Sequence, residues 1–243
     1  MISIIVPCYN EAESLPLLAD AVFKVLSENS IDGEMVVVDD NSPDGTGQIA
    51  EELGKKYNVK TVHREKKAGL SGAVMAGIDA ASGDIIGVMD ADLSHDPAII
   101  PRLVKPLEEN RAQVSIGSRH VPGGGSDHWP LIRRFISKTA ILMGRIVTDV
   151  RDVTSGYFFF RREIIKDAEI NPIGFKIGLE IFVKASYEHF IEIPFIFKDR
   201  QHGQSKLGRG EVVNYLKHLA ALRKFLGEHK DRKRPTAVYE QKD

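Results

Sequence analysis

Residues 85–95 read Ile85-Ile86-Gly87-Val88-Met89-Asp90-Ala91-Asp92-Leu93-Ser94-His95, a small and apolar run that ends in two carboxylates. Such a run predicts a buried strand. Side chains at positions i and i+2 of an extended chain lie on one face, so Asp90 and Asp92 can converge on one object. Sites for Mg2+ or Mn2+ often use one or two carboxylates together with substrate phosphates. Asp-x-Asp is also common in polar turns, but ligands of open α/β sheets bind beyond the carboxyl ends of strands, which favours a ligand site.

The composition is that of an ordinary globular protein. The chain has 243 residues, 42% of them hydrophobic and 28% charged, which fits one large domain or one and a half. A net charge of −1 argues against a nucleic-acid partner. The single Cys8 excludes an intrachain disulfide and fits a reducing compartment. No run approaches the ~20 apolar residues of a membrane-spanning helix and no signal peptide is recognisable, so we expect a soluble or peripheral intracellular protein.

The first half of the chain alternates predicted strands and helices. Strands are expected over residues 2–6, 35–39, 58–63, 84–89 and 113–117. Helices are expected over about 12–29, 43–56, 69–81 and 97–110. Ser42-Pro43 and Asp96-Pro97 each predict an N-cap followed by proline at the first helical position. This alternation predicts a mostly parallel sheet with helices on both faces.

The pattern changes after Arg119. Residues 120–126 form a glycine-rich loop of the type that makes lids. Residues 131–150 and 212–226 have apolar positions at helical spacing and basic residues on another face, which predicts two amphipathic helices. Packing on the core is the ordinary explanation for one such helix, but two basic ones beside a candidate site make contact with a membrane surface worth considering. Residues 228–243 are nearly all polar and predict a disordered tail.

Two other predicted strand ends carry acidic or aromatic side chains. They read Val-Pro-Cys-Tyr-Asn-Glu at 6–11 and Val-Asp-Asp-Asn-Ser-Pro-Asp-Gly-Thr at 38–46. Asp39 and Asp40 point to opposite faces, so at most one reaches a ligand, and a turn or cap role is favoured for Asp39. A carboxylate there can accept hydrogen bonds from the N–H edge of a base. The glycines of 69–77 match neither a dinucleotide fingerprint nor a Walker loop, and they predict close approach of a helix to the sheet.

Four segments, at 6–11, 38–46, 89–95 and 117–119, resemble in order and spacing a family 2 nucleotide-sugar glycosyltransferase. Three more, at 129–134, 152–156 and 200–207, resemble the polyprenyl-phosphate (dolichol-phosphate) mannose synthases. The resemblance covers about residues 2–226 and implies an α/β fold of the GT-A nucleotide-diphospho-sugar transferase type, with a mostly parallel central sheet flanked by helices. It also implies three parts: a nucleotide-sugar-binding core over 1–125, an acceptor-binding part with amphipathic interface helices over 126–227, and the tail over 228–243.

The resemblance implies roles for individual residues. Guanosine would be held by Pro7, Tyr9, Glu11, Val38 and Asp40. Ribose, metal and diphosphate would meet Asp90, Ala91 and Asp92, with Ser94 as a third metal ligand where family members often have Gln. The nucleotide diphosphate and the lipid phosphate would be gathered by Arg119, Arg133, Arg200 and Lys206. Arg119 is the best placed because it directly follows a strand. The catalytic candidates are Asp92, Arg119 and Arg200.

The implied reaction is a metal-dependent transfer, with Mg2+ or Mn2+, of mannose from GDP-mannose to a dolichyl or polyprenyl phosphate. Inversion would give a β-mannosyl phosphate lipid. The enzyme would work on the cytosolic face of a membrane, the endoplasmic reticulum in a eukaryote or the plasma membrane in a prokaryote, with small membrane-anchoring subunits as possible partners. A phosphate monoester is already anionic near neutral pH and needs no strong general base, which fits the lack of a recognisable His–Asp or Ser–His pair. Two alternatives stay open: a polyprenyl-phosphate glucosyltransferase that uses UDP-glucose, and a non-catalytic nucleotide-sugar-binding subunit.

Overall fold

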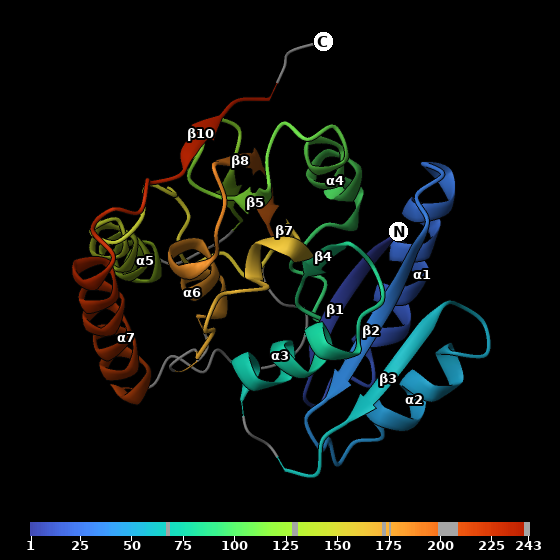
Figure 1. Ribbon diagram of the computed structural model, residues 1–243. Helices are drawn as coiled ribbons and strands as arrows, with labels where there is room; N and C mark the ends of the chain where they lie inside the picture. Colours follow the sequence, from blue (N-terminus) through green and yellow to red (C-terminus); the bar gives the residue numbers. More distant parts are fainter. Residues whose placement is uncertain (67–68, 128–130, 172–173, 175, 199–208, 241–243) are drawn as a thin grey trace.

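A computed structural model describes residues 1–66, 69–127, 131–171, 174, 176–198 and 209–240, with the side chains of 131–134 and 209 left undescribed. Its centre is an eight-stranded sheet in the order β10-β8-β5-β7-β4-β1-β2-β3 (Figure 1). The strands are β1 (Ile2–Cys8), β2 (Gly33–Asp39), β3 (Val59–His63), β4 (Ile85–Val88), β5 (Val114–Ser118), β7 (Phe158–Arg161), β8 (His189–Pro194) and β10 (Thr236–Val238). Every pairing is parallel except those of β7, which runs antiparallel between β4 and β5. The mostly parallel sheet is therefore confirmed.

Helices cover both faces of this sheet. They are α1 (Ser14–Glu28), α2 (Thr46–Leu53), α3 (Leu70–Ala80), α4 (Ile100–Glu108), α5 (Leu131–Gly144), α6 (Ile177–Lys184) and α7 (Arg209–Glu228), with 3-10 turns η1 (Pro97–Ile99) and η2 (Arg162–Ile165). A two-stranded ribbon joins β6 (Gly125–Ser126) to β9 (Ile196–Phe197). The β6 strand lies in the loop expected over 120–126.

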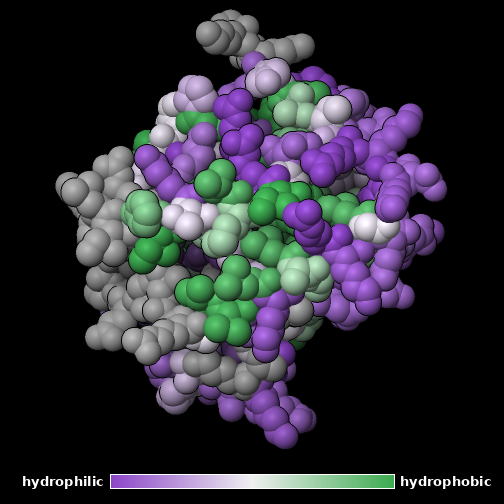
Figure 2. All heavy atoms as spheres, turned by 90° about the vertical axis from the view of Figure 1, so that its left-hand side faces the viewer, coloured by the Kyte–Doolittle hydropathy of each residue, from purple (hydrophilic) through white to green (hydrophobic). Residues whose placement is uncertain are grey.

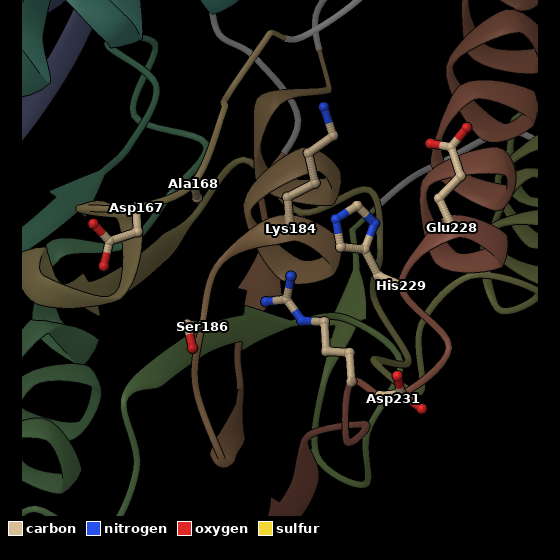
Figure 3. A pocket seen from close by; sticks show the side chains of 8 residues that line it. Asp167, Ala168, Lys184, Ser186, Glu228, His229 and Asp231 are labelled. Atoms are coloured by element: carbon tan, nitrogen blue, oxygen red, sulfur yellow. The ribbon is translucent and has the colours of Figure 1, made fainter.

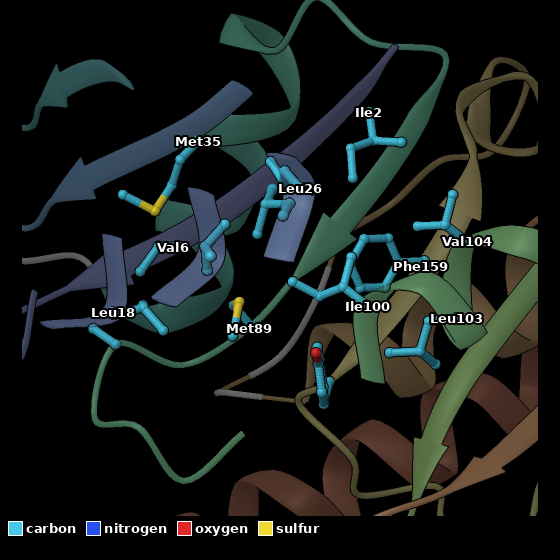
Figure 4. Close-up of a cluster of buried hydrophobic side chains, with 14 of the residues drawn as sticks. Ile2, Val6, Leu18, Leu26, Met35, Met89, Ile100, Leu103, Val104 and Phe159 are labelled. Atoms are coloured by element: carbon cyan, nitrogen blue, oxygen red, sulfur yellow. The ribbon is translucent and has the colours of Figure 1, made fainter. Parts of the chain in front are cut away.

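The alternation of side chains along the strands produces two separate cores. Ile2, Ile4 and Val6 of β1 pack on α1, α2 and α4 (Figure 4). Ile5, which points the other way, belongs to the core formed with α3, α5, α6 and α7. Both faces of the central strands are thus buried, which is why their sequences are continuous apolar runs.

Two glycines permit this packing. A Cβ on Gly77 of α3 would lie 2.4 Å from Ile5 Cγ2, so the predicted close approach of this helix to the sheet is confirmed. A Cβ on Gly87 of β4 would lie 2.3 Å from Cε1 of Phe159, its partner on β7. The missing side chain in β4 therefore makes room for the aromatic ring of the antiparallel neighbour.

Several predicted boundaries were wrong. Helix α2 begins at Thr46 rather than at 43, because the Ser42 hydroxyl accepts a hydrogen bond from Asn10 N and caps no helix. The Asp96 cap is confirmed, since its carboxylate accepts from Ala98 N at 3.0 Å. Helix α5 ends at Gly144 rather than at 150. Helix α7 extends over 209–228, two or three residues beyond the range expected at each end.

The prediction of disorder over 228–243 is wrong for residues 236–238. Residues 236–238 form β10, which pairs in parallel with β8 and closes the edge of the sheet. Arg102 of α4 then holds Glu240 through two hydrogen bonds of 2.8 and 2.7 Å. Strands β7, β8 and β10 come from beyond residue 125 and complete the sheet begun before it. The sheet is therefore shared between the parts that the sequence analysis separated at 125.

Candidate functional site

The order of strands creates a switch point beside β1. The chain adds β2 and β3 on one side of β1 and then crosses to place β4 on the other side. Ligands of open α/β sheets bind in the crevice at such a reversal, beyond the carboxyl ends of the strands. Most of the residues predicted to bind a ligand lie at or just beyond the carboxyl ends of β1, β2, β4 and β5, so four parallel strands deliver them to one edge. Because β7 runs antiparallel, residues 152–157, which lead into it, reach the same edge.

Strand β1 separates from β4 just before Pro7. Pairing between β1 and β4 stops at Ile5 and Val88, so Pro7, which has no N–H to donate, lies where β4 no longer offers an acceptor. Beyond it Tyr9 is half-buried. The Glu11 carboxylate accepts a hydrogen bond of 2.6 Å from the Ser14 hydroxyl, which ties Glu11 to the start of α1.

The residues predicted after β2 are more buried than a ligand site requires. Val38 lies inside β2, paired with β1 and β3, and its side chain is fully buried in the core, so its side chain does not reach a ligand. Asp40 is 5% exposed, and its carboxylate accepts hydrogen bonds from Arg64 Nη1 at 2.8 Å and Gly69 N at 3.1 Å. Asp39 accepts from Ser42 N, which confirms its predicted turn role. Arg64 was missed because no local pattern links it to Asp40, 24 residues earlier.

Strand β4 ends at Val88, before the two aspartates. The chain bends over 91–93, and Leu93 adopts the left-handed φ of 60°. The extended-chain argument for Asp90 and Asp92 therefore does not describe the backbone here, although both follow the strand as predicted. The Asp92 carboxylate is buried and accepts from Ser94 N at 3.1 Å. The Asp90 side chain is 28% exposed, and within the described parts of the chain no hydrogen bond reaches its carboxylate.

Asp90, Asp92 and Ser94 carry oxygen ligands of the kind that a hard divalent cation prefers. Among the described residues no group of three or more His, Cys, Asp or Glu side chains could hold a metal ion. Mg2+ and Mn2+ need fewer protein ligands than that, since substrate phosphates and waters complete their coordination. The Ser94 hydroxyl is buried and has no hydrogen-bond partner among the described residues. An open carboxylate on Asp90 and an unsatisfied oxygen on Ser94 are both suited to such an ion.

Arg119, directly after β5, is held in place by Asp152. Its Nε and Nη2 donate to the two oxygens of Asp152 at 2.8 and 2.7 Å, and its backbone N donates to the same carboxylate at 2.9 Å. Asp152 is fully buried. Burial disfavours charge on both groups, yet their attraction prevails and leaves the pKa of Arg119 raised and that of Asp152 lowered. The guanidinium is thus positioned before any ligand binds.

A second cation, the half-buried Lys176, has no counterpart among the residues predicted from the sequence. It precedes α6, and its Nζ donates to Thr154 O at 3.3 Å. Burial, assisted by the charge of Arg119, lowers its pKa to about 8, while Asp152, Asp90 and Glu211 act in the opposite direction. Lys176 adds positive charge to the site that holds Asp90 and Arg119. An isolated lysine in a loop gives no local signal of such a role.

Residues 3–168 match the model of the family described as glycosyl transferase family 2. The chain belongs to glycosyl transferase family 2.

Named relatives of this family 2 chain confirm the resemblance to the dolichol-phosphate mannose synthases. A dolichol-phosphate mannosyltransferase of Pyrococcus furiosus is 45% identical over 93% of this chain and 65% of its own length. The enzyme of the same name from Saccharomyces cerevisiae is 36% identical over 92% of this chain and 87% of its own. A polyprenol monophosphomannose synthase of Mycolicibacterium smegmatis is 36% identical over 86% and 82%. This chain thus spans just under two thirds of the Pyrococcus protein and most of the other two.

Solved structures confirm the predicted GT-A-type fold. A mannosyltransferase from Pyrobaculum calidifontis, in complex with GDP-Man and Mn2+, has a TM-score of 0.62 at 18% identity and covers 96% of this chain and 65% of its own. Glucosyl-3-phosphoglycerate synthase from Mycobacterium tuberculosis, in complex with Mn2+, UDP and phosphoglyceric acid, has a TM-score of 0.65 at 19% identity and covers 93% and 78%. At these identities the likeness shows the shared fold alone.

Three predicted residues of this glycosyltransferase lie outside what the structure describes. Arg200 and Lys206 fall within residues 199–208, which are not described. Arg133 is part of α5, but its side chain is not described. Their roles stay predictions.

A separate hollow of the glycosyltransferase lies between α6 and the end of α7 (Figure 3). Its volume is about 470 Å³. Two cations that line it already have partners within the protein. Lys184 forms an ion pair with Glu180 at 2.5 Å, and Arg232 donates a hydrogen bond to Ala185 O. None of the predicted site residues lines it. We therefore place the site at the sheet edge, where the chemistry-bearing residues gather, and not in this hollow.

Proposed function

We propose that this chain is an inverting mannosyltransferase that moves mannose from GDP-mannose to a dolichyl or polyprenyl phosphate and yields a β-mannosyl phosphate lipid. The observation that carries the proposal is 36–45% identity, over most of the chain, to relatives named dolichol-phosphate mannosyltransferase or polyprenol monophosphomannose synthase. The donor is supported by a structural neighbour that was solved with GDP-Man. The sheet edge with Asp90, Asp92 and Arg119 supplies the charges that such a transfer needs.

Asp90, Asp92 and Ser94 would hold a Mg2+ or Mn2+ ion in this proposal. When bound, such an ion supplies Lewis-acid stabilisation of charge on the nucleotide diphosphate. The fold neighbours were solved with Mn2+, which supports the use of a divalent cation. Ser94 is a weaker ligand than the carboxylates because a neutral hydroxyl offers less charge.

The remaining residues would bind the two substrates. The guanosine would lie against Pro7, Tyr9, Glu11, Val38 and Asp40, although the Val38 side chain is fully buried in the core. The ribose and diphosphate would meet Asp90, Ala91 and Asp92. Arg119, Arg133, Arg200 and Lys206 would bring the diphosphate and the lipid phosphate together, since cations offset the repulsion of two anions. The acceptor phosphate is its own nucleophile, so the site needs no general base.

A membrane surface is the expected location of the lipid acceptor. No helix among the described residues is both long and apolar enough to cross a membrane. Apolar side chains do gather on the face that α5 and α7 form (Figure 2). Its exposed members are Phe135, Ile136, Leu142, Ile146, Val212, Val213 and Leu216. We propose that this apolar face rests on the cytosolic side of a membrane, alone or beside a small anchoring subunit.

Turnover of radiolabelled GDP-mannose with a short-chain polyprenyl phosphate and Mn2+ tests the proposal. We expect labelled lipid from GDP-mannose, none from UDP-glucose, and a loss of more than about 100-fold in the Asp92→Asn chain, because several kcal/mol of charge stabilisation depend on that ligand. Lipid product from UDP-glucose alone would identify the glucosyltransferase. Stabilisation by GDP without turnover of either donor would identify a non-catalytic binding subunit.

A further inference from the structure

His95 lies in the segment between β4 and η1, and no function has so far been assigned to it. It is 2% exposed, and its Nδ1 accepts a hydrogen bond of 3.0 Å from the backbone N of Asp90. A ring nitrogen that accepts cannot carry a proton, so the neutral ring has its hydrogen on Nε2. That Nε2 lies 3.8 Å from Oδ2 of the same Asp90. One imidazole therefore holds the backbone of Asp90 and faces its carboxylate.

The imidazole is itself held by aromatic rings. It stacks on Tyr157 with ring centres 4.8 Å apart and planes at 10°. The rings of Phe195 and Phe197 meet it edge-on at 5.7 and 5.9 Å. The Tyr157 hydroxyl donates to Asp96 O at 3.0 Å, which anchors the stacking partner to the residue after His95. These contacts restrict the ring to one orientation.

Gly156 shows how close the two side chains lie. A Cβ added there would be 3.5 Å from Cε1 of His95 and 3.6 Å from Oδ1 of Asp90. The ring and the carboxylate thus border the same small space beside the segment that leads into β7. A partly exposed carboxylate with no hydrogen bond from the described residues would otherwise turn freely about its side-chain torsions.

We propose that His95 is a positioning residue that orients Asp90 for the divalent cation, through its Nδ1 on the backbone and its Nε2–H toward the carboxylate. The inference rests on the proposed function, in which Asp90 is a metal ligand. Partners of metal ligands in other proteins act in this way, and their loss typically lowers metal affinity by about 10–100-fold.

Three substitutions separate the hydrogen bond from the packing of the ring. His95→Phe keeps an aromatic ring and loses both nitrogens. His95→Asn loses the ring but places an amide oxygen near the position of Nδ1, where it can accept from Asp90 N. His95→Gln places an amide near Nε2 and offers no acceptor at Nδ1.

Mn2+ binding is then measured in the presence of GDP by the loss of the free-ion signal in electron paramagnetic resonance, a readout that needs no turnover. We expect His95→Phe to bind Mn2+ about 10–100-fold more weakly than the unchanged protein, and His95→Asn to stay within a few-fold of it. A role in packing alone predicts the reverse order and would overturn the proposal. Where His95→Phe does not fold, His95→Asn should bind more tightly than His95→Gln, and equal affinities would overturn it.

Two controls complete the experiment. His229→Gln, at the residue that follows α7, should leave Mn2+ binding unchanged. Asp90→Asn should weaken it strongly. If the unchanged protein binds no Mn2+, or Asp90→Asn has no effect, the cation site of the proposed function fails and the positioning role falls with it. If those two behave as expected and His95→Phe binds normally, only the positioning role fails.

Discussion

Two ion pairs are formed near the candidate site. Asp152 is buried and holds Arg119, and Asp40 is buried and holds Arg64. The Asp90 carboxylate differs from these, because its nearest described partner is the His95 ring at 3.8 Å. Paired charges are costly to disturb, whereas an open carboxylate at a sheet edge is available to a ligand. Of these three described carboxylates, only that of Asp90 is left open to a ligand.

Asp152→Asn should destabilise the fold by about 3–5 kcal/mol at neutral pH, because it leaves the Arg119 guanidinium buried without its counter-charge. The lowered pKa of Asp152 means that the pair stabilises the protein above the ordinary carboxyl pKa and that this stability is lost as pH falls through the lowered value. The gap in unfolding free energy between the two chains should therefore shrink in acid, as measured by urea denaturation. Asp149→Asn, on an exposed carboxylate, is the control and should change little.

Lys176→Met should alter the stability of the protein in alkali. The pKa of Lys176 is about 8 in the folded chain, compared with the ordinary value of 10.5. Between these two pH values the unfolded chain therefore binds one more proton than the folded chain. The contribution of Lys176 to the unfolding free energy should therefore rise as pH increases through that interval. Measured at several pH values, the unfolding free energy of the unchanged protein should rise relative to that of Lys176→Met as the pH increases. Parallel curves would contradict this, and the exposed Lys24→Met provides the comparison.

Strand β4 and helix α7 show how elements are fitted to their neighbours. In β4 a glycine leaves room for Phe159 of β7. Two hydrogen bonds attach helix α7. The Tyr215 hydroxyl donates to Ala140 O of α5, and His218 forms a hydrogen bond with the carboxylate of Glu180 in α6. These attachments lie on the inner side of α7 and leave Val212, Val213 and Leu216 exposed. The helix is thus fixed to the protein while its apolar outer side stays available.

Gly87→Ala should destabilise the protein by about 1–3 kcal/mol or more, because the added methyl group overlaps the ring of Phe159 in the middle of the sheet. Thermal or urea unfolding measures the loss. Gly227→Ala serves as the matched control, since nothing lies within 4 Å of its added Cβ. An equal effect of the two substitutions would show that helix or strand propensity, rather than the contact with Phe159, sets the cost.

The candidate site and the apolar face of the protein are carried by one framework. Strands from both halves of the chain build the sheet, so the site residues and the helices α5 and α7 are carried by a shared core. This arrangement suits an enzyme with one water-soluble substrate and one substrate that stays in a lipid surface.

Replacement of both Phe135 and Leu142 by serine should weaken binding to anionic lipid vesicles by more than about tenfold, since each fully buried side chain of this size contributes about 1.5–3 kcal/mol. The two are 72% and 70% exposed, so folding should be unaffected. Co-sedimentation with vesicles measures the effect, while GDP binding should stay unchanged. Leu17→Ser, an exposed apolar residue on α1, is the control. Unchanged vesicle binding by the double variant would show that this face does not bind the membrane.

Local sequence pattern was sufficient for the strands and helices of the first half, the two amphipathic helices and the carboxylates that follow β4. Side-chain periodicity and strand-end chemistry are properties of neighbouring residues, and one sequence displays them. The pairings of Asp40 with Arg64 and of Asp152 with Arg119 join residues 24 and 33 positions apart, and the contact of β10 with β8 joins residues 47 apart. No local pattern names such partners, because they meet only when the sheet brings distant strands together. The charges of the site could thus be predicted from the chain, but their pairing, burial and freedom to bind a ligand were set by folding.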